Sequence, residues 1–115
     1  MNKIKFHTIE NELFYKGKII LKYEMEYPEL VETRNKEKLE EFNHINLREI
    51  KELKEYIEEE LYEKTKKEGR IEFLRECNVI QNEEGLITLS FNEYIEFTNE
   101  HNTEQKTKIE TWNLN

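Results

Sequence analysis

The residues that most often perform chemistry in proteins are thinly spread along this sequence. Three histidines, His7, His44 and His101, lie far apart and lack the paired spacing of structural zinc sites. The single Cys77 excludes an internal disulfide and cannot build a zinc site alone. We therefore expect no metal and no cofactor, with the histidines at the surface or in loops.

The acidic residues also lack a catalytic arrangement. Every carboxylate is a glutamate, which excludes a Ser-His-Asp triad and Asp-rich calcium loops. Glu58, Glu59 and Glu60 are consecutive on an expected helix and point in different directions, so they cannot flank one substrate bond. The three glycines form no phosphate-binding loop, and Cys77 is expected to be a small buried side chain. We expect no catalytic residues and no enzymatic activity.

The sequence favours binding over catalysis, and the predicted binding site centres on Tyr94. Tyr94 alternates with the apolar side chains around it, so it is expected on the opposite face of its strand together with Ser90 and Asn92. An aromatic residue among small polar side chains on an open sheet face is suited to anchor a partner. The predicted binding set is Tyr94, Asn92, Ser90 and His101, the last from the following loop. In the alternative arrangement, the helix covers this face.

Two elements must position these residues. Residues 19–27 alternate between apolar and charged side chains, which predicts a strand with one dry and one wet face, ended by Pro28. A helix is expected from about 47 to 67, with Asn46 as its cap. It follows a surface connection at 29–43 that contains one helical turn near 36–41. Its apolar stripe comprises Ile50, Leu53, Ile57 and Leu61.

Shorter alternating segments complete the expected sheet. An edge strand begins at 4–6, a turn is expected at Gly17, and Ile71, Phe73, Cys77 and Val79 share a face. Glu93 interrupts the apolar face of the next strand, which predicts a bulge or a sheet edge. In the last strand the apolar register is expected to slip between Ile109 and Trp112. The chain is predicted to form a single domain over 1–115, of class α+β, with one long helix packed on a twisted antiparallel sheet.

Composition limits the partners. Charged residues make up 38% of the chain and the formal net charge is −8, which argues against a nucleic-acid binder and allows a basic partner or simple solubility. No stretch has the apolar length of a membrane span, and no signal peptide is visible. The expected location is the cytoplasm, unless the sequence is a piece of an exported protein.

Several short motifs, in their order along the chain, resemble a known bacterial family. These are residues 26–30 (Glu-Tyr-Pro-Glu-Leu), 45–46 (Ile-Asn), 85–94 (Gly-Leu-Ile-Thr-Leu-Ser-Phe-Asn-Glu-Tyr) and 112–114 (Trp-Asn-Leu). They resemble the domain of unknown function found in RsiV-type anti-sigma factors and beside the catalytic part of PdaC-type peptidoglycan deacetylases. In that family, Gly-Gly-Ala-His usually follows the tyrosine strand, whereas residues 98–101 here keep only the histidine.

The resemblance implies an exported, non-catalytic module. The first functional hypothesis is therefore a binding or sensing module for a cell-envelope protein, such as a muramidase, or for a glycan. The second is a small acidic cytoplasmic protein that binds and inhibits a basic partner, which the net charge permits. Neither hypothesis involves nucleic acid or membrane insertion.

Overall fold

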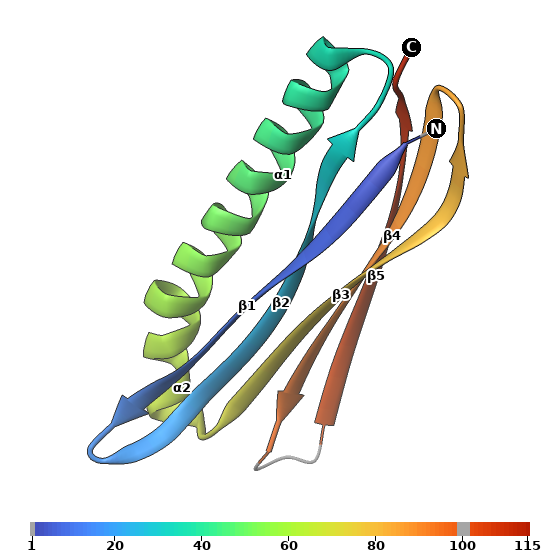
Figure 1. The fold of residues 1–115 in the computed structure, drawn as a ribbon. Helices are drawn as coiled ribbons and strands as arrows, with labels where there is room; N and C mark the ends of the chain where they lie inside the picture. Colours follow the sequence, from blue (N-terminus) through green and yellow to red (C-terminus); the bar gives the residue numbers. More distant parts are fainter. Residues whose placement is uncertain (1, 99–101) are drawn as a thin grey trace.

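The structure is a computed structural model that describes residues 2–98 and 102–115, apart from the side chain of Glu68. In this part of the chain a five-stranded sheet is joined to one long helical segment, which confirms the predicted α+β class (Figure 1). The strands are β1 (Lys3–Tyr15), β2 (Lys18–Glu32), β3 (Ile71–Glu83), β4 (Leu86–Phe97) and β5 (Asn102–Asn113). The helical segment comprises α1 (Lys36–Tyr56), the π-helical turn η1 (Ile57–Leu61) and α2 (Tyr62–Glu68).

The sheet is mostly antiparallel. Its strand order is β1-β2-β3-β4-β5, and only β2 and β3 run parallel. They are parallel because the helical segment carries the chain back along the sheet between them, as a parallel pair requires. The parallel ladder is short, from Leu21↔Ile71 to Met25↔Arg75. This one parallel pair corrects the expectation of an entirely antiparallel sheet.

The alternation predicted for β2 is confirmed. Leu21, Tyr23 and Met25 are buried, whereas Lys22 and Glu24 are exposed. This alternation arises because successive side chains along a strand point in opposite directions. The predicted end at residue 28 is wrong, because the strand continues for four more residues.

Pro28 is tolerated because β2 has lost its second partner at this point. The last pair with β3 is Met25↔Arg75, while the pairing with β1 continues. The N–H of Leu30 points away from β1 and donates to Asn43 Oδ1 of α1 at 2.7 Å. The N–H groups of alternate residues point to the same side of a strand, so an N–H at residue 28 would also point to the side without a strand. The lack of an N–H in proline therefore removes no hydrogen bond of the sheet.

Helix α1 begins earlier than predicted. Its N-cap is Asn35, whose Oδ1 accepts hydrogen bonds from the backbone N–H groups of Glu37 at 3.0 Å and Lys38 at 3.3 Å. These bonds satisfy two of the donors that every helix start leaves without a partner. The helix therefore occupies part of the segment that was expected to be a surface connection.

Asn46 is not a cap but a buried residue inside α1. Its Nδ2 donates to the carbonyl oxygen of Phe42, one turn earlier, at 2.9 Å. The bond satisfies the amide within the helix, which explains how a residue typical of caps is accommodated there. The turns before Asn46, predicted only as one separate helical turn, bring Phe42 and Leu39 into the core.

The π-helical turn η1 keeps the predicted apolar stripe on the sheet. Ile50, Ile57 and Leu61 are buried and Leu53 is partly buried against them, which confirms the stripe. Successive steps of four residues rotate slowly around an α-helix, which has 3.6 residues per turn. The wider turn at η1 offsets this rotation, so Leu61 and Thr65 still face inward.

A two-residue turn joins β1 to β2. Lys16 and Gly17 have φ angles of 50° and 78°, the conformation of a type I′ hairpin turn, and glycine adopts it without strain. The predicted turn at Gly17 and the edge position of β1 are confirmed. The strand is longer than expected and runs without interruption from Lys3 to Tyr15.

The predicted shared face of β3 is confirmed: Ile71, Phe73 and Cys77 are buried, and Val79, opposite the buried Leu89, lies on the same face but is 38% exposed. The expectation for Glu93 is wrong. Glu93 lies in a regular ladder opposite Arg75, on a strand with neighbours on both sides, so it marks neither a bulge nor an edge. In β5 the apolar register slips as predicted, since Ile109 and Trp112 lie on opposite faces of an unbroken strand.

The core lies between the helical segment and one face of the sheet, in two clusters. The first is formed by Leu21, Tyr23, Met25, Ile50, Ile57, Leu61, Ile71 and Phe73. The second, near the start of α1, is formed by Leu30, Phe42, Cys77, Ile87, Leu89, Phe91 and Leu114. The other face of β4 is left without a helix, and this is the face with the predicted binding residues.

Candidate functional site

The structure places Tyr94, Asn92 and Ser90 on one face of β4. Phe91, on the opposite face, is buried in the core with Phe42 of α1. Because side chains alternate along a strand, the three predicted residues point away from the helical segment. Their predicted placement is confirmed, and the alternative in which the helix covers Tyr94 is excluded.

Two of these residues already have partners within the sheet. Thr107 Oγ1 of β5 donates to Asn92 Oδ1 at 2.8 Å, and Asn92 Nδ2 donates to Ser90 Oγ at 3.4 Å. Both ends of the Asn92 amide are therefore engaged. Asn92 and Ser90 belong to the hydrogen-bonded surface of the sheet, and Tyr94 is the member of the set that reaches a hollow in that surface.

Tyr94 lines a groove of about 410 Å³ on the helix-free face. Its direct cross-strand neighbour, Leu74 of β3, lines the same groove, so an aromatic and an aliphatic side chain lie side by side. We call this hollow the Tyr94 groove. Its other lining residues are Lys22, Glu24, Glu72, Phe73, Glu96 and Thr103.

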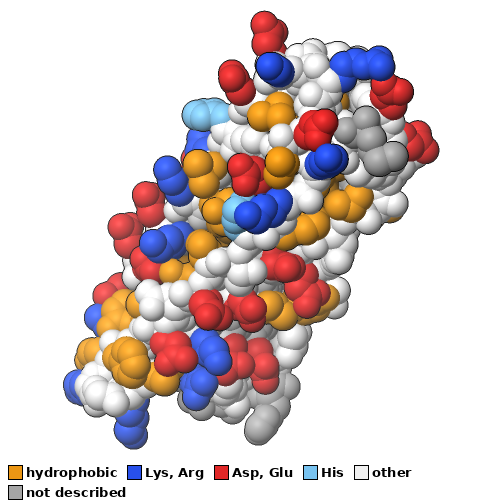
Figure 2. All heavy atoms as spheres, in the orientation of Figure 1, with side chains coloured by type: hydrophobic (Ala, Val, Ile, Leu, Met, Phe, Trp, Pro, Cys, Tyr) orange, Lys and Arg blue, Asp and Glu red, His pale blue; other side chains and the backbone are white. Residues whose placement is uncertain are grey.

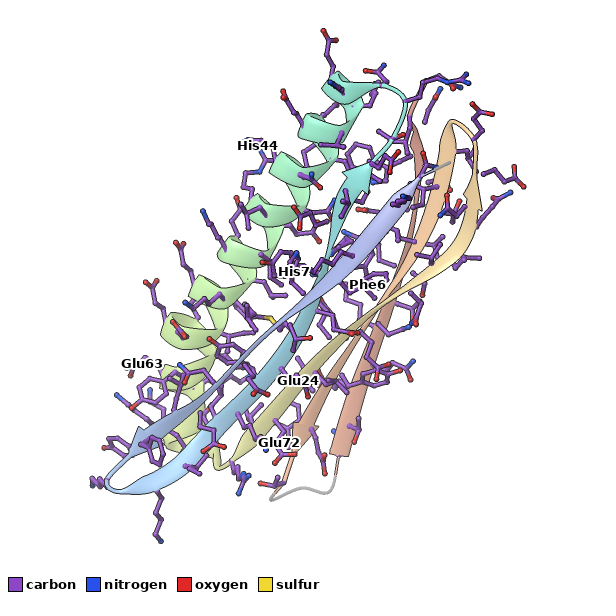
Figure 3. The ribbon with its side chains drawn as sticks, viewed as in Figure 1. Phe6, His7, Glu24, His44, Glu63 and Glu72 are labelled. Carbon is purple, nitrogen blue, oxygen red and sulfur yellow. The ribbon has the colours of Figure 1, made fainter. Side chains whose placement is uncertain are left out.

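The Tyr94 groove is acidic. Glu24 and Glu72, on neighbouring strands, are labelled in Figure 3, and Figure 2 shows acidic side chains gathered over the lower part of β2 and β3. Arg70 Nη2 donates to Glu72 Oε1 at 2.9 Å, which leaves the carboxylates of Glu24 and Glu96 opposite the single charge of Lys22. Excess negative charge beside an aromatic ring favours a cationic group, through Coulomb attraction and cation–π contact.

The two described histidines lie apart. His7 Nε2 is 2.6 Å from Glu29 Oε1 and its ring stacks on Tyr27 with 5.1 Å between centroids, whereas His44 is exposed on α1 (Figure 3). His101, the remaining member of the predicted binding set, lies outside the described residues. Within 2–98 and 102–115, no group of three or more His, Cys, Asp or Glu side chains is placed to hold a metal ion.

A polar cluster that the sequence analysis missed centres on Arg75 of β3. The side chain is 2% exposed, and its guanidinium carbon lies 4.6 Å from the ring centroid of Phe91. Nη1 donates to the carbonyl oxygen of Glu26 at 3.1 Å and Nη2 to Glu49 Oε1 at 3.3 Å, while Glu93 Oε1 lies 3.9 Å from Nε. Charges on two adjacent strands thus pair inside an otherwise apolar face.

This Arg75 cluster holds the sheet together where β2 leaves β3. The backbone N–H of Cys77 donates to Glu26 Oε1 at 3.1 Å, and the carbonyl of Glu26 accepts from Arg75. Side chains therefore satisfy backbone groups that have no strand partner there. The adjoining cavity of about 110 Å³ has room for a few water molecules. The geometry gives Arg75 a structural role.

The remaining candidates for chemistry are committed to the fold. Cys77 is buried as predicted, and burial raises the pKa of its thiol to about 12, so it stays protonated near neutral pH. Glu58 Oε1 accepts a hydrogen bond from the hydroxyl of Tyr23 at 2.7 Å, whereas Glu59 and Glu60 are exposed. The three adjacent carboxylates do not converge on one point.

The comparisons with known proteins support the fold. No family model matches the chain, and no curated protein matches it. A solved structure of a DUF3298 family member from Bacteroides fragilis is similar, with a TM-score of 0.62 and 14% identity over 98% of this chain. This chain spans 56% of that protein's chain, about half its length. DUF3298 is the domain found in RsiV- and PdaC-type proteins, so the fold agrees with the resemblance noted from the sequence.

Proposed function

We propose that the protein is a non-enzymatic binding module that engages its partner through the Tyr94 groove. The observation that carries the proposal is the position of Tyr94, beside Leu74, in an open groove with three glutamates and one lysine. An aromatic anchor supplies contact area, and the carboxylates select for positive charge. The partner that fits is a basic segment of a protein, with a lysine or arginine side chain over Tyr94.

The proposed setting of this binding is the cell envelope. The similarity to a DUF3298 structure supports membership of the family found in RsiV- and PdaC-type proteins, and membership is part of the proposal. The proposed partner class is then a basic envelope protein such as a muramidase, with an envelope glycan as the other candidate ligand.

A second proposed function is a small acidic protein that binds and inhibits a basic partner in the cytoplasm. The net charge of −8 favours this function, because a large excess of one sign attracts opposite charge over a broad surface. It differs from the first proposal in one respect that can be measured. Binding by overall charge depends weakly on any single residue, whereas binding in a groove depends on its aromatic anchor.

The test is a calorimetric titration of the protein with a basic muramidase and, separately, with soluble peptidoglycan fragments. Tyr94→Ala is expected to weaken binding of the true partner by about tenfold or more, the loss typical of an interface hot spot. The matched control is Tyr56→Ala, since Tyr56 is an exposed tyrosine on α1, away from the groove.

Salt separates the two proposed functions. Groove binding is expected to fall modestly as salt rises, while inhibition through overall charge falls steeply. Binding that persists unchanged in Tyr94→Ala but disappears with added salt would reject the groove and favour the acidic inhibitor. A lack of binding to both probes would remove the envelope partners as candidates.

A further inference from the structure

Positive charge is concentrated at one end of this acidic protein. Residues 14–20, around the β1–β2 turn, and residues 62–70, at the end of the helical segment, contain six of the 18 Lys and Arg residues but only two of the 26 Glu residues. We call this end the basic tip. Figure 2 shows Lys and Arg side chains together with hydrophobic ones at the end where Figure 1 places this turn and α2. The rest of the chain therefore carries a large negative excess.

Direct contacts join the two segments of the basic tip. The Tyr62 hydroxyl donates to the carbonyl oxygen of Phe14 at 2.7 Å. Lys66 Nζ lies 5.1 Å from the ring centroid of Tyr15 and 4.7 Å from that of Tyr62, and Lys16 Nζ lies 5.3 Å from the Tyr15 ring. The tip is therefore a fixed arrangement of aromatic rings and ammonium groups, supported by cation–π contacts.

Apolar surface accompanies the charge. Phe14, two residues before the turn, is 56% exposed, and Tyr15 is 37% exposed. Phe14 pairs across the hairpin with Ile19, which is partly buried. Exposing a phenylalanine ring to water at the end of this hairpin is unfavourable, and the ring contributes little to the core. It suits a boundary between water and a hydrocarbon phase, where rings enter the interface and lysines stay at the head groups.

We propose that the basic tip docks on the surface of an anionic lipid bilayer. The lysines around residues 16–18 and 64–67 would meet the head groups, and Phe14 would enter the interfacial layer. Docking differs from spanning: in the described part of the chain no helix is long and apolar enough to cross a membrane. A soluble polyanion would account for the lysines but gives no role to Phe14, so the lipid surface is the occupant that explains both features.

The negative remainder of the protein does not prevent docking. The molecule is elongated, with principal extents of 50 × 22 × 17 Å. Glu24, the nearest groove carboxylate on β2, lies seven residues beyond Gly17, which corresponds to about 20 Å along an extended strand. Charges are largely screened beyond about 8 Å at physiological ionic strength. The two surfaces meet at Arg70, which pairs with Glu72 of the groove at 2.9 Å. Lys16 and Lys18, at the far end of the tip, lie beyond the screening range of Glu24.

Vesicle flotation tests the proposal with the full chain. The protein is expected to float with vesicles of phosphatidylcholine and phosphatidylglycerol, and not with phosphatidylcholine alone. Lys16→Gln and Lys18→Gln are each expected to weaken binding by about fivefold, the effect of removing one lysine near an anionic surface. Phe14→Ser is expected to weaken it by about tenfold, from the lost apolar contact.

Matched variants distinguish the tip from general charge and apolarity. Lys51→Gln with Lys54→Gln removes two exposed lysines of α1, and Tyr56→Ser removes an exposed ring there, so both are expected to bind vesicles like the unchanged protein. Phe14→Trp is expected to bind at least as tightly and to show a blue shift of tryptophan fluorescence on vesicles.

Four results would overturn the proposal. They are equal flotation with neutral vesicles, equal losses in the α1 variants, an unshifted spectrum for Phe14→Trp, or tight binding by Phe14→Ser with loss only in the lysine variants. The last result would assign the tip to a soluble polyanion. Salt-sensitive self-association without vesicles, abolished by the tip variants, would instead assign it to a second copy of the chain.

Discussion

Arg75 is a buried charged residue that links β3 to β2 and to α1. Replacing it with methionine keeps an unbranched side chain beside Phe91 but leaves the Glu26 carbonyl without its donor and Glu93 without its cation, while Glu49 keeps its pair with Lys108 at 2.9 Å. Leaving a buried acceptor without its hydrogen bond costs about 1–3 kcal/mol. We therefore expect Arg75→Met to lower the free energy of unfolding by this amount in urea melts.

Arg70 provides the matched control for that experiment. It pairs with Glu72 at 2.9 Å, but the two side chains are 43% and 40% exposed, and a solvent-exposed pair contributes less than about 1 kcal/mol. Arg70→Met should therefore be nearly neutral. Similar small losses in both variants would show that the Arg75 cluster does not hold β2 to β3.

Cys77 makes stability sensitive to alkaline pH. Burial raises the pKa of the folded thiol from 9.0 to about 12, so the unfolded thiol ionises first. Its contribution to stability is present below pH 9.0 and falls as the pH rises toward 12, because unfolding releases a proton in this range. Urea melts below and above pH 9.0 should show a smaller loss in Cys77→Ala than in the unchanged protein. Equal losses would contradict the assignment.

At the scale of elements, the start of α1 is open to a direct test. Asn35→Ala removes the acceptor of two backbone N–H groups and is expected to lower stability by about 1 kcal/mol. Hydrogen exchange should become faster at Glu37 and Lys38 and stay unchanged in the second half of the helix. Protection that is lost only around residue 46 would restore the helix start predicted from the sequence.

The helix start shows what the sequence pattern could and could not predict. The stripe from Ile50 to Leu61 was predicted because it repeats at three and four residues, and β2 because it alternates. The first turns of α1 were predicted only as one separate helical turn, because they contribute only Leu39 and Phe42 to the core and because Asn46 has the chemistry of a cap. The predicted end of β2 at Pro28 was wrong for a related reason. A proline is tolerated where the β2–β3 ladder has ended, and the end of that ladder depends on a contact between residues distant in sequence.

The buried stripe itself gives a second prediction for this element. Ile57 is 0% exposed at the start of η1, whereas Glu59, two residues later, faces solvent. Ile57→Ala is expected to cost about 2–5 kcal/mol through lost burial and a residual cavity, and Glu59→Ala should be near neutral. Denaturant melts with equal, small effects at both positions would mean that η1 does not keep the stripe on the sheet.

At the scale of the whole molecule, the sequence predicted the position of the binding surface better than its chemistry. Alternation was sufficient to place Ser90, Asn92 and Tyr94 on the helix-free face. The acidic character of the groove was not predictable in this way, because Glu24, Glu72 and Glu96 come from three strands and meet only through the sheet register. The basic tip was missed for the same reason, as its two segments are distant in sequence.

The last prediction joins the two ends of the molecule and depends on both proposals. If the Tyr94 groove binds a basic partner while the basic tip docks on lipid, the partner should float with anionic vesicles only when this protein is present. Tyr94→Ala should release the partner but leave the protein on the vesicles, and Phe14→Ser should release both together. The two losses should be independent, because Tyr94 and Phe14 come from different strands and Phe14 does not line the Tyr94 groove. Loss of vesicle binding in Tyr94→Ala, or of partner binding by Phe14→Ser in solution, would show that the two sites are one surface.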